Sequence, residues 1–365
     1  MTQRLRVAVL FGGRSSEHSI SCATAAGVLG AIDRSRFEVI PLGFTRDGAL
    51  VLEDDDPQKF ALGGAELPEV VDNGTRVHWP ENAHSRELTV ERDGQRSSLG
   101  VIDVVFPILH GSYGEDGTVQ GLFELAGLPY VGSGVLASAL AMDKHFTKTV
   151  LQHAGIAVAP WHTLSRHDWQ SDPDAATAAL RDLALPVFVK PARAGSSVGV
   201  SKVSDPTEMD AALRIAFDED DTVLIEQGVV GREVEIAVLG ARPGQKPRTS
   251  DHAGEIVVSG RDFYDFDAKY LGADGIELVC PAPMGSERLA EMKSIALTAF
   301  DAVGAEGLAR VDFFLTDDGF VLNEVNTLPG FTPISMFPTC WIASGLSYAD
   351  LITELIDVAV ERGAR

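Results

Sequence analysis

The segment that most constrains the fold is a pair of apolar runs near the C-terminus, separated by a short acidic turn. Residues 310–316 (RVDFFLT) and 320–326 (FVLNEVN) are rich in Val, Phe and Leu, and the turn between them ends in Gly319. Two such runs around a glycine-containing turn are typical of a β-hairpin. The sequence therefore predicts two antiparallel strands joined by a three-residue loop, Asp317 to Gly319, with the glycine in a left-handed conformation.

The register of this hairpin predicts where polar side chains gather. Counting outward from a Thr316–Phe320 pair brings four polar side chains together on one face, because side chains alternate along a strand. They form two cross-strand pairs, Asp312 with Glu324 and Arg310 with Asn326. Carboxylate and amide oxygens are ligands that Mg²⁺ takes while it also binds phosphates. Isolated charges on half-buried strands are costly, so the pattern favours a metal and phosphate site over an exposed hairpin with a solvated acidic turn.

Composition and charge restrict the class of protein. The chain has 365 residues, 45% of them hydrophobic, which is typical of a globular protein of two or three domains. A net charge of −23 argues against a nucleic-acid partner. The three cysteines are far apart and form no CxxC pair, which argues against a disulfide framework or zinc site and favours a reducing compartment. No apolar segment approaches the ~20 residues needed to cross a bilayer, so we expect a cytoplasmic protein without a membrane partner.

The first part of the chain has the pattern of an α/β domain. Strands and helices alternate there, as in parallel βαβ units. The expected strands are 7–11, 37–43 and 101–109. Ser15 or Ser16 is expected to cap the first helix, and the second helix is expected to begin near Asp116. Residues 45–98 are polar and glycine-rich and indicate an insertion of short strands and loops. Gly127 is the expected end of the second helix.

Two further units follow. The second is expected to contain one helix over 137–154 and strands over 186–190, 199–203 and 222–227. The third is expected to contain a strand over 233–239, a long segment rich in Gly, Asp and Tyr, an amphipathic helix from about 289 to 303, the hairpin and a closing helix over 348–360.

A glycine- and serine-rich loop over 191–199 separates two of these strands. Such a loop, preceded by Lys190, can turn backbone N–H groups towards phosphate oxygens, although flexible surface hairpins have similar composition. The chain contains neither GxxxxGK[ST] nor GxGxxG, which argues against a P-loop or a dinucleotide fold. A phosphate loop between two strands indicates a different nucleotide-binding fold.

Two strand-to-helix turns in the first unit carry candidate binding residues. His110 and Glu115 lie in a glycine-rich loop that opens a helix, so local packing does not explain them. Glu17 lies at the start of another helix. It is either a first-turn acid that stabilises the helix dipole or a carboxylate for a substrate ammonium group.

Six segments, in order, resemble the D-alanine–D-alanine ligases of the ATP-grasp superfamily. They are HGSYGEDGTVQG (110–121), GSGVLASALAMDK (132–144), VKPARAGSSVGVSKV (189–203), LIEQGVVGREVEIAV (224–238), FYDFDAKY (263–270) and ARVDFFLTDDGFVLNEVNTLPGFTPIS (309–335). The resemblance implies an ATP-grasp fold of mixed α/β character. A Rossmann-like domain with a parallel sheet would cover residues 1–132, and two ATP-grasp subdomains, 133–226 and 227–365, would enclose ATP.

The resemblance also implies a role for each matching position in nucleotide and metal binding. The phosphates of ATP would contact Lys144, Lys190, Ser196, Ser197 and Lys269. Glu226 and Val229 would face adenine, and Glu233 the ribose. Two Mg²⁺ or Mn²⁺ ions would be held by Asp312, Glu324 and Asn326, and a monovalent cation is a further implied ion.

The implied reaction joins two D-alanine molecules through an acyl phosphate, for cell-wall precursor synthesis. The residues implied for it are Glu17 and His110 for the first substrate, Ser335 for the second, and Arg310 and the backbone N–H of Gly330 for the oxyanion. Tyr270 would form a hydrogen bond with Ser196, and Ser196 would in turn contact Glu17. The segment 264–270 would be a lid over the site. Relatives that use D-lactate carry a His in place of the lid Tyr, so the Tyr in this chain favours D-alanine as the second substrate. A homodimer is implied as well.

Two alternatives to this reaction stay open at the level of sequence. One is another ATP-grasp ligase, such as a D-alanine–D-lactate or D-alanine–D-serine ligase. The other is a nucleotide-binding protein without catalysis, because fold alone does not determine function.

Overall fold

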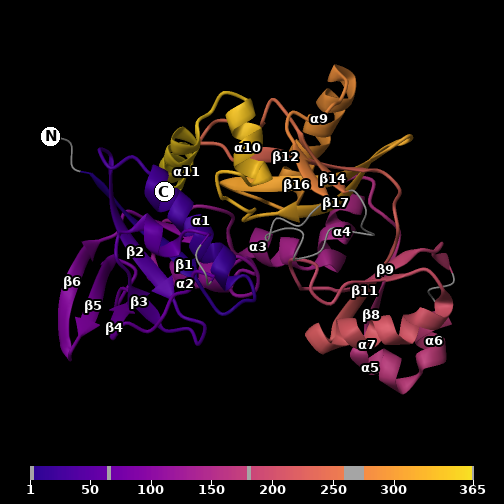
Figure 1. Ribbon diagram of the computed structural model, residues 1–365, viewed down its shortest axis with the longest axis horizontal. Helices are drawn as coiled ribbons and strands as arrows, with labels where there is room; N and C mark the ends of the chain where they lie inside the picture. Colours follow the sequence, from indigo (N-terminus) through magenta and orange to yellow (C-terminus); the bar gives the residue numbers. More distant parts are fainter. Residues whose placement is uncertain (1–3, 64–66, 179–181, 259–274, 364–365) are drawn as a thin grey trace.

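The structure is a computed structural model that describes residues 4–63, 67–178, 182–258 and 275–363. Strands in these ranges form four sheets, and the N-terminal region lies at the opposite end of the molecule from the central sheet (Figure 1). No helix in the described ranges combines the length and the apolar character needed to cross a membrane. The mixed α/β character agrees with the prediction.

The N-terminal sheet has the strand order β3-β2-β1-β7, with β1 parallel to β2 and β7. Its strands are β1 (Leu5–Gly12), β2 (Phe37–Phe44), β3 (Leu50–Leu52) and β7 (Val104–Ile108). The expected insertion forms a short helix, η1 (Pro57–Phe60), and a separate antiparallel sheet of β4 (Thr75–His78), β5 (Glu87–Arg92) and β6 (Gln95–Val101). The helices are α1 (His18–Ala31) and α2 (Thr118–Ala126). Gly127 ends α2 in a left-handed conformation, as predicted.

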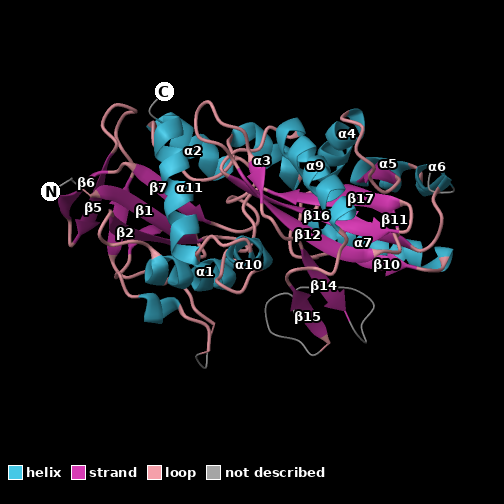
Figure 2. Ribbon diagram, turned by 90° about the horizontal axis from the view of Figure 1, so that it is seen from above, coloured by secondary structure: helices cyan, strands magenta, loops and turns pink. Residues whose placement is uncertain are grey.

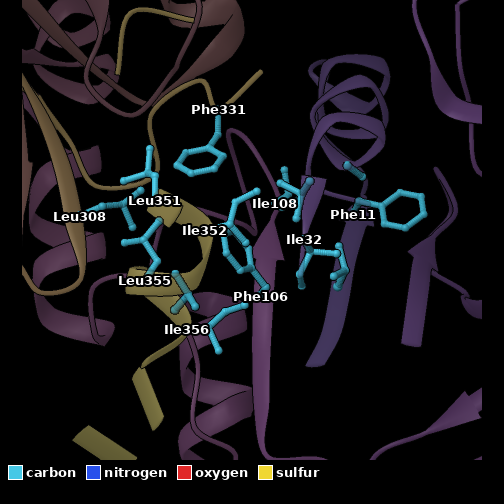
Figure 3. Packing of buried hydrophobic residues seen from close by; sticks show 14 of the residues in the cluster. Phe11, Ile32, Phe106, Ile108, Leu308, Phe331, Leu351, Ile352, Leu355 and Ile356 are labelled. Carbon is cyan, nitrogen blue, oxygen red and sulfur yellow. The ribbon is translucent and has the colours of Figure 1, made fainter. Parts of the chain in front are cut away.

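The closing helix, α11 (Tyr348–Gly363), packs against the N-terminal region although it lies at the other end of the sequence. Figure 3 shows its apolar side chains beside those of β7. The buried residues at this contact are Leu351, Ile352, Leu355 and Ile356 from the helix and Phe106 and Ile108 from the strand. Burying each such side chain contributes roughly 1.5–3 kcal/mol, so this contact holds the two ends of the chain together.

The helix expected over 137–154 is two helices, α3 (Val135–Met142) and α4 (Lys144–His153). The break is at Asp143, which has extended backbone and accepts hydrogen bonds from the backbone N–H groups of His145 and Phe146. An Asp that caps the following helix satisfies groups that a continuous helix would have bonded internally. The prediction of one helix was wrong for this reason.

The central sheet is antiparallel, with the order β10-β9-β11-β8, and α7 packs on one face. Its strands are β8 (Trp161–Ser165), β9 (Val187–Pro191), β10 (Ser201–Val203) and β11 (Thr222–Gln227). The accompanying helices are α5 (Arg166–Ser171), α6 (Pro173–Ala178), η3 (Pro206–Glu208) and α7 (Met209–Glu219).

The C-terminal sheet provides the other large surface (Figure 2). Its strands are β12 (Arg232–Leu239), β13 (Arg248–Thr249), β14 (Gly254–Val258), β15 (Ile276–Val279), β16 (Leu308–Thr316) and β17 (Gly319–Asn326). Val234, Ile236 and Val238 of β12 belong to a core shared with α9 (Ser286–Ala302) and with Leu151 of α4. The intervening Glu233 and Glu235 line a cavity. A short helix, α10 (Met336–Ala343), contacts β12 and β14.

The hairpin β16–β17 confirms the predicted cross-strand pairs and corrects the predicted turn. Thr316 pairs with Gly319, so two residues rather than three connect the strands. A β-bulge then inserts Asn323 into β17. The two deviations cancel, and the pairs Asp312 with Glu324 and Arg310 with Asn326 form as predicted.

Candidate active site

A cavity of about 470 Å³ lies where the three regions meet, and its wall contains every predicted site residue that the structure describes. These are Glu17, His110, Lys144, Lys190, Ser196, Ser197, Glu226, Val229, Glu233, Arg310, Asp312, Glu324, Asn326, Gly330 and Ser335. Lys269 and Tyr270, with the rest of the predicted lid over 264–270, lie outside the described residues. Residues separated by more than 300 positions in sequence thus share one surface.

One wall carries what we call the carboxylate cluster: Glu235, Arg310, Asp312, Glu324 and Asn326. The Arg310 guanidinium donates two 2.8 Å hydrogen bonds to the Asp312 carboxylate, and its Nε lies 3.0 Å from Glu235. The Asn326 amide N–H donates to Asp312 at 2.8 Å and to Glu324 at 3.3 Å. One guanidinium is therefore shared among neighbouring carboxylates.

Charge in the carboxylate cluster is unbalanced. Burial raises the pKa of Asp312 and Glu324 adds to the effect, although Arg310 opposes both. Burial alone would lower the pKa of Arg310, but Asp312 and Glu235 hold it well above its ordinary value. The guanidinium stays charged, and an excess of negative charge surrounds it.

A second part of the cavity wall carries what we call the lysine cluster: Lys148, Lys190 and Glu226. Each ammonium group forms an ion pair with one oxygen of the Glu226 carboxylate. Lys148 is 2% exposed and Glu226 is 3% exposed. Burial alone would raise the pKa of Glu226, but the two ammonium groups outweigh it and hold the pKa below its ordinary value. Burial lowers the pKa of Lys148, although Glu226 opposes this. With both lysines charged, the two ammonium groups exceed the single carboxylate.

The glycine- and serine-rich loop closes one end of the cavity. Ser196 and Ser197 have φ of +48° and +59°, a left-handed conformation that is unfavourable for consecutive non-glycine residues and is often found at functional sites. The Lys144 ammonium donates a 2.6 Å hydrogen bond to the Ala194 carbonyl, and the Ser196 hydroxyl donates to the Glu17 carboxylate. The loop is thus tied both to α4 and to the N-terminal region.

The N-terminal region contributes buried acids and a histidine. The N-cap of α1 is Glu17, which makes no side-chain cap bond, rather than either of the two serines predicted to cap the helix. The Ser15 hydroxyl donates to the His110 carbonyl at 2.7 Å and accepts from the backbone N–H of Glu17 at 3.2 Å. Burial lowers the pKa of His110. Burial, with the nearby charge of Glu17, raises the pKa of Glu115 well above its ordinary value. Two of these groups therefore favour their neutral forms.

Gly330 and Ser335 lie together in the loop before α10. The Ser335 hydroxyl oxygen accepts from the backbone N–H of Thr332 at 3.1 Å and lies 2.7 Å from the Thr332 hydroxyl. A Cβ on Gly330 would lie 3.3 Å from the Ser335 oxygen, closer than most real contacts. The glycine allows the loop to close beside the serine.

Three charged residues of the cavity wall were missing from the set predicted for the site: Glu115, Lys148 and Glu235. Lys148 follows Lys144 by one helical turn, so both lie on the same face of α4. Glu235 follows Glu233 by two positions on an otherwise apolar strand and pairs with Asp312 across β12 and β16. The same alternation that identified the hairpin could have identified Glu235. Glu115 lies between glycines in the sequence, which marks it as a candidate binding residue but indicates no specific role.

Two family models match the chain: "D-ala D-ala ligase N-terminus" over residues 6–133 and "D-ala D-ala ligase C-terminus" over residues 150–357. A D-alanine–D-alanine ligase from Pseudarthrobacter chlorophenolicus is 52% identical over 98% of this chain and 94% of its own length. One from Streptomyces coelicolor is 47% identical over 98% of this chain and 93% of its own.

Solved structures agree with this. The D-alanine–D-alanine ligase from Coxiella burnetii has a TM-score of 0.83 at 34% identity and covers 100% of this chain and 96% of its own. The VanG D-Ala:D-Ser ligase from Enterococcus faecalis has a TM-score of 0.84 at 35% identity, and the match covers 98% of this chain and 100% of its own. These relatives have the ATP-grasp fold, which confirms the predicted fold class. The chain belongs to the D-alanine–D-alanine ligase family.

Proposed function

We propose that the protein uses ATP to join two D-alanine molecules into D-alanyl-D-alanine, with release of ADP and phosphate. The observation that carries this proposal is the cavity, where residues expected to bind nucleotide, metal and both substrates lie on one surface. The product would be a precursor for the cell wall. We also propose that the chain divides into three domains, with boundaries at residues 132/133 and 226/227. The helix α11, which belongs to the third of these, packs against α1 and β7 of the first.

The nucleotide would lie between the lysine cluster and the carboxylate cluster. Lys144, Lys190 and the backbone of the loop at Ser196 and Ser197 would face the phosphates, because hydrogen bonds from charged donors to phosphate oxygens are strong. Adenine would contact Glu226 and Val229, and the ribose would contact Glu233; these three residues line the cavity. Lys269 is a further proposed phosphate ligand outside the described residues.

The carboxylate cluster fits a divalent cation. Among the described residues, no group of three or more His, Cys, Asp or Glu side chains is arranged as a metal site. The proposed donors are the two carboxylates and the amide that the hairpin pairing brings together. That set, Asp312, Glu324 and Asn326, leaves coordination positions for phosphate oxygens and water, as Mg²⁺ prefers. The excess negative charge around Asp312 is what two Mg²⁺ or Mn²⁺ ions would offset. When bound, they would neutralise charge on the transferred phosphoryl group.

The first step would be attack of a D-alanine carboxylate on the γ-phosphate of ATP, which releases ADP. Glu17 would bind the ammonium group of this substrate, and His110 would lie at the same subsite. The Ser196 hydroxyl, which donates to Glu17, would hold that carboxylate in place. Tyr270 is proposed as the other partner of Ser196. The chemistry in this step is mainly positioning and charge neutralisation.

The second step would be attack of the amine of a second D-alanine on the carbonyl carbon of the acyl phosphate. Arg310 and the backbone N–H of Gly330 would donate to the oxyanion, and phosphate would then leave. Ser335 would bind the carboxylate of the second substrate, next to Gly330. A guanidinium held permanently charged by neighbouring carboxylates is suited to stabilise such an oxyanion.

The test is a phosphate-release assay with ATP, Mg²⁺ and a panel of D-amino and D-hydroxy acids. We expect release with D-alanine alone and a dipeptide product identified by mass spectrometry. Release that requires D-lactate or D-serine would support a different ligase. ATP binding without release for any acid on the panel would refute catalysis.

Two further proposals are a cytoplasmic location and a homodimer, of which the second rests on the family resemblance alone. Sedimentation equilibrium over a range of concentrations tests the second, with a mass near twice 38.9 kDa expected. A mass that stays at one chain would refute it.

A further inference from the structure

Two of the three cysteines lie side by side in the folded chain. The sulfur atoms of Cys280 and Cys340 are 3.9 Å apart, although the residues are separated by 60 positions in sequence. Both are free thiols. Cys22, the third, is fully buried in the N-terminal core. The proposed ligation reaction gives the pair no role.

The two thiols differ in reactivity. Cys280 is half-buried, whereas Cys340 is fully buried. The contact between the two thiols lowers the pKa of Cys280 below its ordinary value, although its partial burial opposes this. The same contact, with burial, raises the pKa of Cys340. Cys280 is therefore both the more accessible thiol and the one that forms a thiolate more readily, which is the character of a thiol that an oxidant attacks first.

The pair connects two segments that line the proposed active site. Cys280 directly follows β15, whose Leu278 lines the cavity. Cys340 lies on α10, one helical turn after Met336, which also lines the cavity. The helix α10 also packs closely on β14, the strand paired with β15, since a Cβ on Gly254 of β14 would clash with the Met336 sulfur. A bond between the cysteines would join these segments behind the cavity wall.

We propose that Cys280 and Cys340 form an oxidation site for peroxide, and that the resulting disulfide ties β15 to α10 and slows the ligase reaction. The inference concerns chemistry that the ligation reaction does not use, and only its activity readout depends on the proposed function.

The oxidation proceeds in two balanced steps. The Cys280 thiolate attacks one oxygen of hydrogen peroxide and breaks the O–O bond, which gives a sulfenic acid at Cys280 and hydroxide that takes up a proton to form water. The Cys340 sulfur, once deprotonated, attacks the sulfenic sulfur, forms the S–S bond and displaces hydroxide, which becomes the second water. Two thiols and one peroxide thus give one disulfide and two water molecules.

The bond would change the shape of the cavity. A disulfide has an S–S length of about 2 Å, so the sulfurs must approach from 3.9 Å. Rotation of the side chains closes part of this gap, and movement of β15 and α10 closes the rest. Because a shift of about 1 Å in a reacting group can cost up to 10²-fold in rate, we expect turnover to fall about tenfold.

The experiment uses the reduced full-length protein, treated with a small excess of hydrogen peroxide and then alkylated. Free thiols are counted, and peptides are analysed by mass spectrometry without reduction. Phosphate release is measured before oxidation, after it and after dithiothreitol. We expect two thiols to be lost, a peptide linking Cys280 to Cys340, an about tenfold fall in turnover and recovery with dithiothreitol.

Two variants act as controls. Cys22→Ala retains the pair and should respond as the wild type does. Cys340→Ser removes the resolving thiol, so Cys280 should stop at sulfenic acid, which dimedone traps, and turnover should fall less than in the wild type. Three free thiols in oxidised wild type would overturn the proposal, as would a Cys280–Cys340 linkage with unchanged turnover. The linkage is read by mass, so it is independent of the proposed function, which the reduced protein tests separately.

Discussion

The two charged walls of the cavity are built from the same kinds of groups in opposite proportions. In the lysine cluster, two ammonium groups share one carboxylate. In the carboxylate cluster, one guanidinium lies among several carboxylates. The pKa of the buried acid moves accordingly: that of Glu226 is lowered, and that of Asp312 is raised. Burial disfavours both charges and prevails at Asp312, with help from Glu324, whereas the two ammonium groups outweigh it at Glu226.

This difference has a consequence for binding. A nucleotide triphosphate needs positive charge beside its phosphate oxygens, and a divalent cation bound to it needs negative charge. Walls with opposite excess charge meet both needs, with the nucleotide between them. Each wall is less stable alone than a balanced cluster would be, because buried charges without full compensation are costly. The comparison predicts that changes in the two clusters have different effects.

The largest expected effect is on stability, from Glu226→Gln. The change leaves Lys148 and Lys190 without their shared carboxylate, and breaking such a buried pair costs roughly 3–5 kcal/mol in the free energy of unfolding. Urea unfolding monitored by circular dichroism measures it. Glu38→Gln, on an exposed partner of Arg6, is the matched control and should change stability little.

The same variant gives a pH prediction. The pKa of Glu226 is lower in the folded than in the unfolded state, so its charge stabilises the fold above the unfolded pKa of ~4.5. This stabilisation is lost as pH falls below that value. In the wild type, the free energy of unfolding should therefore fall below pH ~4.5 more steeply than in Glu226→Gln. Parallel curves would show that the lysine cluster does not hold Glu226 charged.

In the carboxylate cluster, Arg310→Ala should act mainly on the reaction. Loss of an oxyanion donor typically costs ~10²–10³-fold in kcat. The variant should also lose stability, because Asp312 and Glu235 lose the cation they share. Steady-state phosphate release measures the effect, with Arg288→Ala on the exposed surface as control. Turnover within tenfold of wild type would contradict the proposed role.

Lys148→Met sharpens the comparison, because it removes one of the two cations on Glu226 and keeps most of the side-chain volume. Lys148 holds the Glu226 carboxylate through an ion pair, and Glu226 is the proposed adenine contact. A hydrogen bond to a charged group contributes ~1.5–3 kcal/mol, so loss of the bond that positions Glu226 should raise the KM for ATP about tenfold, with a smaller change in kcat. Lys148→Arg should restore part of the affinity. Lys202→Met, on an exposed strand position, is the control. An unchanged KM would mean that Lys148 only supports the fold.

The smallest effect is expected from Asp143→Ala, which removes the cap of the helix that carries Lys144 and Lys148. Loss of such a cap costs ~1 kcal/mol, seen as a lower Tm. Asp143→Asn keeps an acceptor and should retain most of the stability. Equal Tm values for the wild type and the Ala variant would show that the cap is not needed to hold α4.

The sequence predicted local features well and long-range packing poorly. The pairing of Asp312 with Glu324 followed from strand alternation, even though the turn and the bulge were not foreseen. The division of α3 from α4 was missed because Asp143 inside an apolar helical pattern has two possible roles. The contact of α11 with β7 could not be predicted, since hydrophobic periodicity identifies a buried face but not its partner.

How well the site residues could be predicted depended on whether a sequence motif or only the folded structure indicates them. Residues in the six family segments were placed by resemblance, and the structure brings those it describes to one cavity. Lys148 was missed because a lysine on a helix is usually solvated, and only the fold reveals that Glu226 lies opposite it. The Cys280–Cys340 contact was missed because it joins two segments that no sequence pattern relates.

The central claim is that the cavity holds a metal-bound nucleotide between walls of opposite charge. A crystal structure with Mn²⁺ and a non-hydrolysable ATP analogue tests it most directly, since anomalous scattering locates the metal independently of the refined coordinates. We predict anomalous peaks beside Asp312, Glu324 and Asn326, with the phosphates extending towards Lys190. Manganese peaks elsewhere, or a nucleotide bound outside the cavity, would contradict the claim.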